Sequence, residues 1–360
     1  MTSFPVHLLS PPTDFAPPPP SELNPAQMIV LKDLETHFGK EGFVLPVKED
    51  EEAMEGLNEV EMMFLSKETF IRFLTGCKWD VLETIARLEK TIIWRRTEKI
   101  DDVKAMADDC GPESETGKNI VLGFTSHAQP IIYFFPHRNT TPVEKRRAVH
   151  AVFMLERAKD LMSEGVNNTV VIFNFSGKRQ GPPTNIGTAR ATLHILSHHY
   201  PETLAFGIFQ DLPWIVKAFV NLMWPFVDPV TKHKTRFGSA DGNMEMMKEA
   251  GMSKEAVLSE CGGSLEWKYD HTSYWPKLIE TCLRKRSADL DRWRSGPRTV
   301  GRSEREFRKP ISLPIYSEGI TDSPEVHIPI SENVQSYPSP SAPPVPSTTT
   351  FTFTSTSTPV

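Results

Sequence analysis

The chain has 360 residues, of which 39% are hydrophobic, so it is long enough for about two domains with a buried core. Its formal net charge of -6 and its pI near 6.0 argue against a nucleic-acid-binding protein. The four cysteines show no Cys-x-x-Cys or Cys-x-x-His spacing, which indicates reduced thiols in a cytosolic protein, not a disulfide framework or a zinc site.

The pattern of apolar residues favours a soluble, cytoplasmic protein. The N-terminal segment MTSFPVHLLSPPTDF has neither a basic stretch nor a continuous apolar run, so it is not a secretory signal. No stretch approaches 18 uninterrupted apolar residues, which argues against a membrane-spanning helix.

Both ends of the chain have the composition of disordered segments. Residues 1–21 contain PPTDFAPPPP and are predicted to form a disordered, proline-rich leader. Residues 296–360 are predicted to be a disordered tail, first basic and then rich in Ser, Thr and Pro. The stretch Arg284–Lys309 carries ten basic residues against four acidic. It suits either a solubilising helix and tail or contact with an anionic membrane surface.

Residues 22–100 are expected to form a helical lobe. Apolar residues recur at helical spacing over Pro25–Phe38, and another helix is expected from Ser66. Lys78-Trp79-Asp80 then makes a turn, in which Asp80 is a suitable N-cap for a long amphipathic helix that ends near Trp94. The residues from Asp101 to Thr116 are expected to be a polar connection.

Residues 115–265 are expected to form an α/β domain. The expected strands are Asn119–Phe124, Pro130–Phe135, Thr169–Phe175 and Leu204–Phe209, the first two as a hairpin. The expected helices are Val143–Glu164, Asn185–Tyr200 and Glu245–Glu260. This alternation predicts a mixed β-sheet flanked by helices. Residues 266–295 are expected to be a C-terminal docking helix.

One expected helix, Pro213–Val227, is apolar nearly all round. Its clearly polar side chains are Lys217 and Asn221, four residues apart on one narrow face. Such a helix must be buried on all sides or must meet something other than water. With about fifteen residues it is shorter than the roughly twenty that span a bilayer. Two interpretations stay open: a central core helix, and a movable lid between an apolar cavity and a membrane surface.

Three spaced motifs surround this helix. They are Tyr200-Pro201-Glu202, Asp211-Leu212-Pro213-Trp214, and Pro225-Phe226-Val227-Asp228-Pro229-Val230-Thr231 followed by Lys234. Together they resemble the signature of the CRAL-TRIO lipid-binding family, in its phosphatidylinositol-transfer branch. The resemblance extends over roughly Glu22–Trp275. It implies an α/β fold with a sheet floor, a lipid cavity above it closed by a gating helix, and a preceding helical lobe.

The resemblance also implies site residues. The gate helix would present Trp214, Phe219, Leu222, Met223, Trp224 and Phe226. The lipid headgroup would be held by Lys78, Glu202, Thr231 and Lys234. This assignment is chemically coherent, because a phosphodiester binds cations and hydroxyl donors and inositol hydroxyls bind a carboxylate. Two cations of the family pattern are missing, since Cys77 and Thr203 stand in their places, and this weakens the predicted headgroup binding.

Other chemistry is disfavoured by the sequence. His194 and His198 have the spacing of two zinc ligands on a helix, but Ile195 stands where a zincin has Glu, so no metal site is expected. The segment around Gly111 and Lys118 departs from a phosphate-binding loop in its spacing and in Asn119. No Gly-x-Ser-x-Gly motif occurs. We therefore expect no enzyme activity and no cofactor, only a bound lipid.

The sequence thus predicts binding, and transfer or presentation between membranes, of a phospholipid, with phosphatidylinositol as the preferred candidate. The protein would associate peripherally and transiently with membrane surfaces, and would not bind nucleic acid. Two alternatives stay open on the same fold. One is an interaction module that binds a protein partner through the helical lobe or the tails, and the other is a carrier of a sterol or terpenoid.

Overall fold

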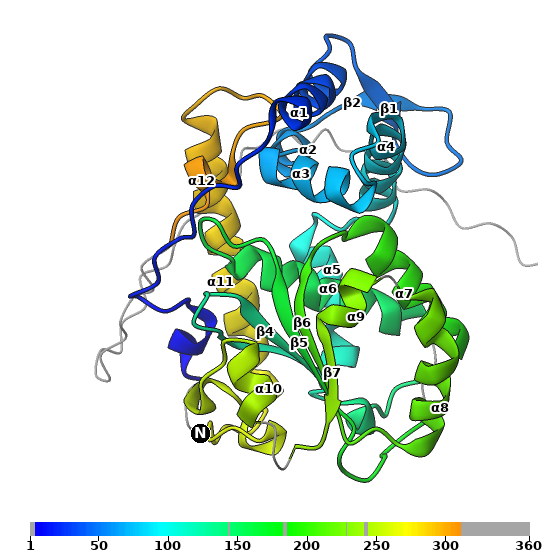
Figure 1. The fold of residues 1–360 in the computed structure, drawn as a ribbon, viewed down its shortest axis with the longest axis vertical. Helices are drawn as coiled ribbons and strands as arrows, with labels where there is room; N and C mark the ends of the chain where they lie inside the picture. Colours follow the sequence, from blue (N-terminus) through cyan, green and yellow to red (C-terminus); the bar gives the residue numbers. More distant parts are fainter. Residues whose placement is uncertain (1–3, 143–144, 183–185, 228, 241–243, 311–360) are drawn as a thin grey trace, which may run out of the picture. The chain divides into compact units, whose positions relative to one another are not determined.

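The computed structural model describes residues 4–142, 145–182, 186–227, 229–240 and 244–310 (Figure 1). At its centre is a five-stranded sheet in the order β3-β4-β5-β6-β7. The strands are β3 (Asn119–Phe124), β4 (Pro130–Phe134), β5 (Thr169–Asn174), β6 (Leu204–Gln210) and β7 (Thr235–Gly238). β3 and β4 form the expected antiparallel hairpin, and β4 to β7 run parallel. The prediction of a mixed sheet flanked by helices is confirmed.

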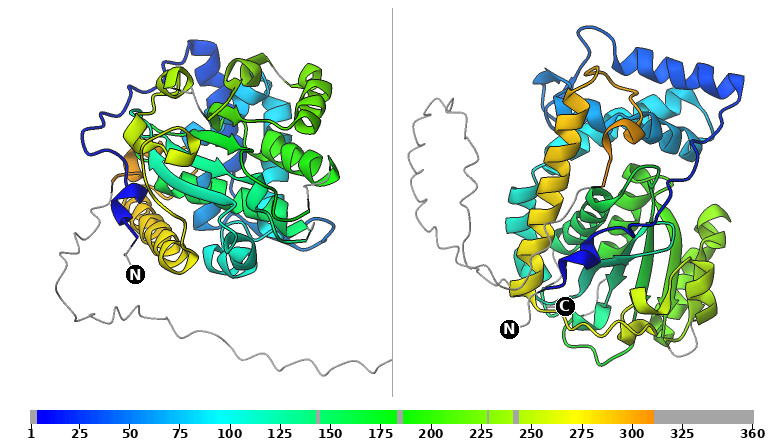
Figure 2. Two further views of the ribbon diagram at one scale, coloured as in Figure 1. Left: turned by 90° about the horizontal axis from the view of Figure 1, so that it is seen from below. Right: turned by 90° about the vertical axis from the view of Figure 1, so that its left-hand side faces the viewer.

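Different helices cover the two faces of this sheet (Figures 1 and 2). One face carries α6 (Lys145–Leu161), α7 (Ile186–His199) and α8 (Trp214–Met223). The other carries α10 (Met244–Glu249) and two short 3-10 turns, η4 (Lys254–Ala256) and η5 (Ser259–Cys261). Neighbouring residues of a strand point to opposite faces, so adjacent residues of β7 contact elements on both faces of the sheet. Arg236 pairs with Glu249 on α10, and Phe237 meets the end of α8.

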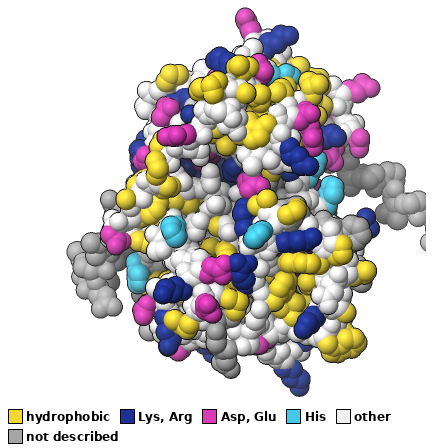
Figure 3. Space-filling model, in the orientation of Figure 1, with side chains coloured by type: hydrophobic (Ala, Val, Ile, Leu, Met, Phe, Trp, Pro, Cys, Tyr) yellow, Lys and Arg dark blue, Asp and Glu magenta, His cyan; other side chains and the backbone are white. Residues whose placement is uncertain are grey.

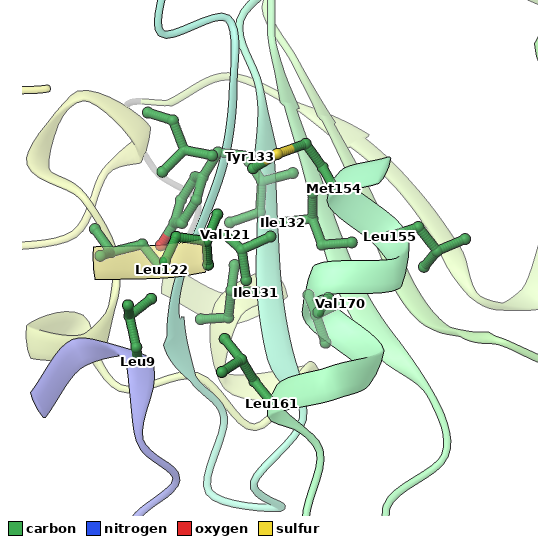
Figure 4. Close-up of a cluster of buried hydrophobic side chains, with 14 of the residues drawn as sticks. Leu9, Val121, Leu122, Ile131, Ile132, Tyr133, Met154, Leu155, Leu161 and Val170 are labelled. Atoms are coloured by element: carbon green, nitrogen blue, oxygen red, sulfur yellow. The ribbon is translucent and has the colours of Figure 1, made fainter. Parts of the chain in front are cut away.

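The core between the sheet and its helices is built from β-branched and aromatic residues. β3, β4 and β5 contribute almost entirely buried side chains, and α6 packs on them with a long apolar face (Figure 4). Val170 and Ile172, in the middle of β5, have no exposed surface. The run of β-branched and aromatic residues in β5 is continuous in the sequence, which is why this strand is readily predicted.

The N-terminal lobe is helical with one small hairpin. Its elements are α1 (Pro25–Phe38), β1 (Val44–Pro46), β2 (Met54–Gly56), α2 (Glu59–Phe64), α3 (Lys67–Gly76) and α4 (Val81–Thr97). Capping boxes at Asn24 and Asn58 begin α1 and α2, while Ser66 and Asp80 cap α3 and α4. The lobe has an apolar core of its own, separate from that of the sheet.

Helix α4 joins the lobe to the α/β part. Trp94 on α4 stacks on His199 at the end of α7, with ring centroids 4.1 Å apart. The Oγ1 atom of Thr91, one turn earlier on α4, lies 2.9 Å from His199 Nδ1. Arg95 donates to Glu156 on α6 at 2.8 Å. These contacts fix α4 against two helices of the sheet layer.

Two expected elements differ from the structure. The residues expected to be a polar connection form α5 (Val103–Ser114), because Asp102 caps it and its buried residues recur at helical spacing from Val103 to Cys110. The helix expected over Glu245–Glu260 is broken: α10 ends at Glu249, and Gly251 follows in the left-handed region with φ 71°. Glycine favours that conformation, and it ends the helix.

The leader is partly ordered. The prediction of disorder is wrong for residues 4–9, where η1 (Val6–Leu9) lies against β3 (Figure 4). Phe4 and Leu9 are 5% and 2% exposed, and Phe4 meets Trp267 and Tyr274 edge-on. The next residues cross to the lobe without helix or strand (Figure 2, right). Burying two large apolar side chains outweighs the disorder that the prolines suggest.

The C-terminal helix lies within the expected range 266–295 and packs against the α/β part. Helix α11 (His271–Arg294) packs on α5 and α6. The hydroxyl of Tyr274 donates to Val121 O and accepts from Val121 N, both at 2.9 Å. This pair of bonds satisfies backbone groups at the edge strand β3.

Residues 296–310 are packed, so the prediction of a disordered tail is wrong for them. They contain α12 (Glu304–Phe307), whose Phe307 is 2% exposed. The basic residues of Arg284–Lys309 are extensively paired: Arg286 bonds Asp101 and Asp160, Arg294 bonds Glu59, and Lys309 bonds Glu164. This pairing with acidic residues of the lobe and of α6 argues against a cationic membrane contact. Residues 311–360 lie outside the described part.

Candidate functional site

Helix α8 exposes apolar side chains to water. Trp214, Ile215 and Leu222 are 78%, 62% and 68% exposed. Hydrophobic surface is visible at the lower right of Figure 3, where Figure 1 places α8. The interpretation of this segment as a fully buried core helix is therefore wrong. None of the described helices is long and apolar enough to cross a bilayer. An exposed apolar cluster of this kind marks a contact surface for a partner or a membrane.

The other side of α8 is less exposed, and the residue after the helix contacts the sheet. Val216, Val220 and Trp224 are half-buried and four residues apart, so they form one stripe of the helix. Trp224 stands at the start of η3 (Trp224–Phe226) and meets the Phe237 ring edge-on, with centroids 5.2 Å apart. The side chains of Phe219, Met223 and Phe226, which the sequence also assigns to the gate, lie outside the described part.

Phe237 is the last of four phenylalanines that form a ladder across the sheet. Phe134, Phe173, Phe209 and Phe237 are directly paired in register on β4, β5, β6 and β7. The first three rings stack at 4.6 and 4.7 Å, and the last follows at 5.4 Å. The first three are only half-buried, and Phe237 is 44% exposed. The sheet thus presents an incompletely covered aromatic face toward α7 and α8.

Two of the four expected headgroup residues meet directly. Lys234 Nζ lies 3.1 Å from Glu202 Oε2, and both side chains are about 30% exposed. Glu202 precedes β6 and Lys234 precedes β7, and these strands are parallel neighbours, so their beginnings lie side by side. Gly207 N also donates to Lys234 O at 2.7 Å, which fixes the backbone of the lysine. The result is a half-exposed carboxylate–ammonium pair at one edge of the sheet.

Lys78 lies in a turn that packs against Pro201, the residue before Glu202. Lys78 and Trp79 have φ of 52° and 66°, so the chain turns sharply between α3 and α4. Cys77 is buried, whereas Lys78 is exposed. A Cβ added at Gly76 would lie 2.8 Å from Pro201 Cβ, so this turn packs on the Tyr200-Pro201-Glu202 segment. Glycine is needed here because no larger residue fits between the two turns.

Thr231 lies on α9 (Pro229–His233), immediately before Lys234. Its carbonyl accepts a bond from Thr235 Oγ1 at 2.7 Å. Thr203, which stands where the family pattern has a cation, is 4% exposed and bonds Pro201 O, so it points into the protein. The structure therefore brings Glu202 and Lys234 into contact, places the Lys78 turn against them, and puts Thr231 on the adjoining helix.

Sequence reasoning missed Arg87, on α4. Its Nε donates to His198 O at 2.7 Å, its Nη2 to Ser197 O, and its Nη1 lies 3.6 Å from Cys77 Sγ. It thus bonds the C-terminal carbonyls of α7. The position of Arg87, three residues after Thr84 on α4, does not predict its hydrogen bonds. Its bonding partners lie at the C-terminal end of a different helix, α7.

The histidines at the end of α7 are neutral. Burial lowers the pKa of His199 to about 3. Partial burial, with the nearby Arg87 charge, also lowers the pKa of His198. His194 and His198 stack with their ring centroids 5.7 Å apart. Within the described ranges, no group of three or more His, Cys, Asp or Glu side chains could hold a metal ion.

Comparison with known proteins identifies the fold family. Residues 114–263 match the CRAL/TRIO domain. The phosphatidylinositol transfer protein PDR17 of Saccharomyces cerevisiae is 32% identical over 260 residues, which cover 69% of this chain and 72% of that protein. The chain belongs to the CRAL-TRIO family. This membership supports the expectation of a lipid-binding protein that is not an enzyme.

Other CRAL-TRIO relatives match over smaller parts of their own length. A CRAL-TRIO domain-containing protein of Schizosaccharomyces pombe is 31% identical over 264 residues, 73% of this chain but 25% of that protein. The phosphatidylinositol transfer protein CSR1 of Eremothecium gossypii is 25% identical over 244 residues, 61% of this chain and 55% of that protein. The crystal structure of Sfh5 aligns with 74% of this chain and 100% of its own, at TM-score 0.44 and 11% identity. The names of PDR17 and CSR1 support the phosphatidylinositol-transfer branch.

Proposed function

We propose that this CRAL-TRIO chain binds phosphatidylinositol and transfers it between membranes or presents it at them, with α8 as the gate. The observation that carries the proposal is the position of α8. The helix exposes Trp214, Ile215 and Leu222 to water, and Trp224, which follows it in η3, contacts Phe237 at the end of a half-exposed phenylalanine ladder. The family membership and the relatives named as phosphatidylinositol transfer proteins support the same function.

The ladder offers a surface for acyl chains. Each lipid CH₂ taken out of an apolar environment costs about 0.8 kcal/mol, so a lipid with two chains leaves a bilayer extremely slowly. A protein that receives the chains on an apolar face removes most of this cost. In our proposal the chains lie between α8 and the rings of Phe173, Phe209 and Phe237, in space that opens when α8 moves away from the sheet. A cavity of about 420 Å³ between the leader and the loop around Asn167 is lined by none of these rings.

The headgroup would bind at the edge of the sheet where Glu202 and Lys234 meet. There Lys234 and Lys78 attract the phosphate, and the Thr231 hydroxyl donates to it. Glu202 accepts from the inositol hydroxyls. In the structure Glu202 and Lys234 form an ion pair with each other. On lipid binding, this pair would be replaced by bonds from Lys234 to the phosphate and from the inositol hydroxyls to Glu202.

Membrane contact would open the gate. The exposed apolar residues of α8 lose water contact when they enter the bilayer surface, and Trp214 suits the interface between headgroups and acyl chains. Lys217, exposed on the same helix, can reach the lipid phosphates while its stem lies along the apolar surface. In this proposal the bilayer takes the place of the water around α8, and the helix then moves away from the ladder.

Native mass spectrometry of the purified chain, combined with a vesicle transfer assay, tests this proposal. We expect a retained mass of phosphatidylinositol in the wild type and transfer of labelled phosphatidylinositol between vesicles. Lys234→Ala should abolish this transfer while the protein stays folded. Lys248→Ala, an exposed lysine on the opposite face of the sheet, should transfer normally.

Three results would contradict the proposal. Unchanged transfer in Lys234→Ala would refute the headgroup assignment. A retained sterol or terpenoid would show that phosphatidylinositol is not the ligand, and the protein would then be a carrier of another apolar molecule. An empty protein that transfers no lipid would favour an interaction module.

A further inference from the structure

Arg87 is held in a fixed position at the junction of the lobe and the sheet layer. Two of its three nitrogens bond the carbonyls of Ser197 and His198 at the end of α7. Its guanidinium also lies over the Phe73 ring, 5.6 Å from the centroid. A planar guanidinium with two nitrogens anchored loses little freedom when a third bond forms.

The third nitrogen faces the headgroup edge. Among the described residues, the partner of Nη1 is the Cys77 thiol at 3.6 Å, and a thiol is a weak acceptor. A Cβ at Gly76 would lie 3.2 Å from this nitrogen and 2.8 Å from Pro201 Cβ. Arg87 Nη1 therefore points at the seam between the Lys78 turn and the segment that carries Glu202.

The charges around this seam favour an anion. Arg87 Nη1 lies at the seam itself, Lys78 is two residues after Gly76 on one side of it, and Lys234 pairs with Glu202, the residue after Pro201, on the other. The surplus of positive charge suits a phosphodiester, which binds cations through charge-assisted hydrogen bonds. Cys77, which contacts Nη1, is buried and carries no competing charge.

We infer that Arg87 is a phosphate-binding residue of the headgroup site, donating from Nη1 to a phosphodiester oxygen of the bound lipid. The inference rests on the proposed function and extends it to a residue on the lobe. It also gives the lobe a part in recognition: the lobe supplies two of the cations, and the sheet layer supplies the third.

Binding of short-chain phosphatidylinositol and short-chain diacylglycerol to the full chain tests this inference. Diacylglycerol fills the same apolar space but has no phosphate. We expect Arg87→Gln to weaken phosphatidylinositol binding roughly 10- to 100-fold, the range for a lost charge-assisted bond, and to leave diacylglycerol binding unchanged. Lys90→Gln, an exposed lysine three residues later on α4, should change neither.

A second variant separates phosphate binding from the bonds that Arg87 makes to α7. Arg87→Lys keeps the cation but cannot bond both carbonyls, so it should retain part of the phosphatidylinositol affinity. The inference is overturned if Arg87→Gln weakens both lipids equally or neither, or if Arg87→Lys behaves like Arg87→Gln. A wild-type chain that binds neither lipid would instead overturn the proposed function, and the inference with it.

Discussion

The exposed leucine on α8 gives the sharpest test of membrane docking. Full burial of a leucine side chain is worth about 1.5–3 kcal/mol, and Leu222 is 68% exposed. Its transfer into the bilayer surface should thus contribute about 1–2 kcal/mol, which corresponds to a roughly 5- to 30-fold change in vesicle binding. Leu222→Ser should lose this contribution. Its unfolding free energy should change by less than about 0.5 kcal/mol, because the side chain packs against little in the folded protein.

Vesicle co-sedimentation at fixed lipid concentration measures this loss, and urea unfolding checks the fold. Leu82→Ser is a matched control, since Leu82 is 80% exposed but lies at the start of α4 in the lobe. The lobe leucine should have no effect on vesicle binding. If both variants bind vesicles equally well, or both lose binding equally, α8 is not the docking surface and the gate mechanism fails.

Three further predictions concern the scaffold. Phe307→Ala should lower the unfolding free energy in urea by about 3–5 kcal/mol, because this ring is 2% exposed; a change under 1 kcal/mol would mean that residues 296–310 are not part of the fold. Glu156→Gln should lower the unfolding free energy by about 3–5 kcal/mol, since it removes the buried partner of Arg95 and of the Tyr200 hydroxyl; a neutral result would contradict the buried network. Burial lowers the pKa of His150 to about 3 in the folded chain. Below about pH 6.5, His150 therefore binds a proton in the unfolded chain but not in the folded chain. The unfolding free energy should therefore be fully present above pH 6.5 and fall by about 1.4 kcal/mol per pH unit for this group between about pH 6 and 4, a slope that His150→Asn should reduce.

The sheet could be predicted from the sequence because its strands carry local signals. The run Thr169–Asn174 is β-branched and aromatic, and the two runs of the hairpin are separated by a short polar turn. The phenylalanine ladder could not be predicted in the same way. Phe173 and Phe209 stack only because β5 and β6 pair in one register, and the sequence of either strand alone does not determine that register.

The ends of the chain show where composition misleads. Proline content predicts a disordered leader. The burial of Phe4 and Leu9 depends on contacts of this segment with β3, and no local sequence pattern predicts those contacts. The basic stretch likewise invites a surface interpretation. The partner of Arg286 at Asp101 stands 185 residues earlier in the chain, so the pairing that neutralises it has no local signature.

Of the proposed headgroup site, the sequence analysis named the residues that belong to a spaced motif. Glu202 and Lys234 belong to such a motif, and the structure joins them. Arg87 belongs to none. It reaches the same edge because α4 crosses the end of α7, which is a consequence of tertiary packing alone.

The row of stacked phenyl rings has a consequence for which lipid molecules the protein distinguishes. Its surface consists of flat hydrocarbon without donors or acceptors, so an acyl chain can slide along it with no preferred register. If acyl chains lie on it as proposed, this surface distinguishes neither chain length nor the position of a double bond closely. Discrimination among lipids would then fall to the charged edge, and the fatty acids carried by the protein would mirror those of the membrane that supplies them.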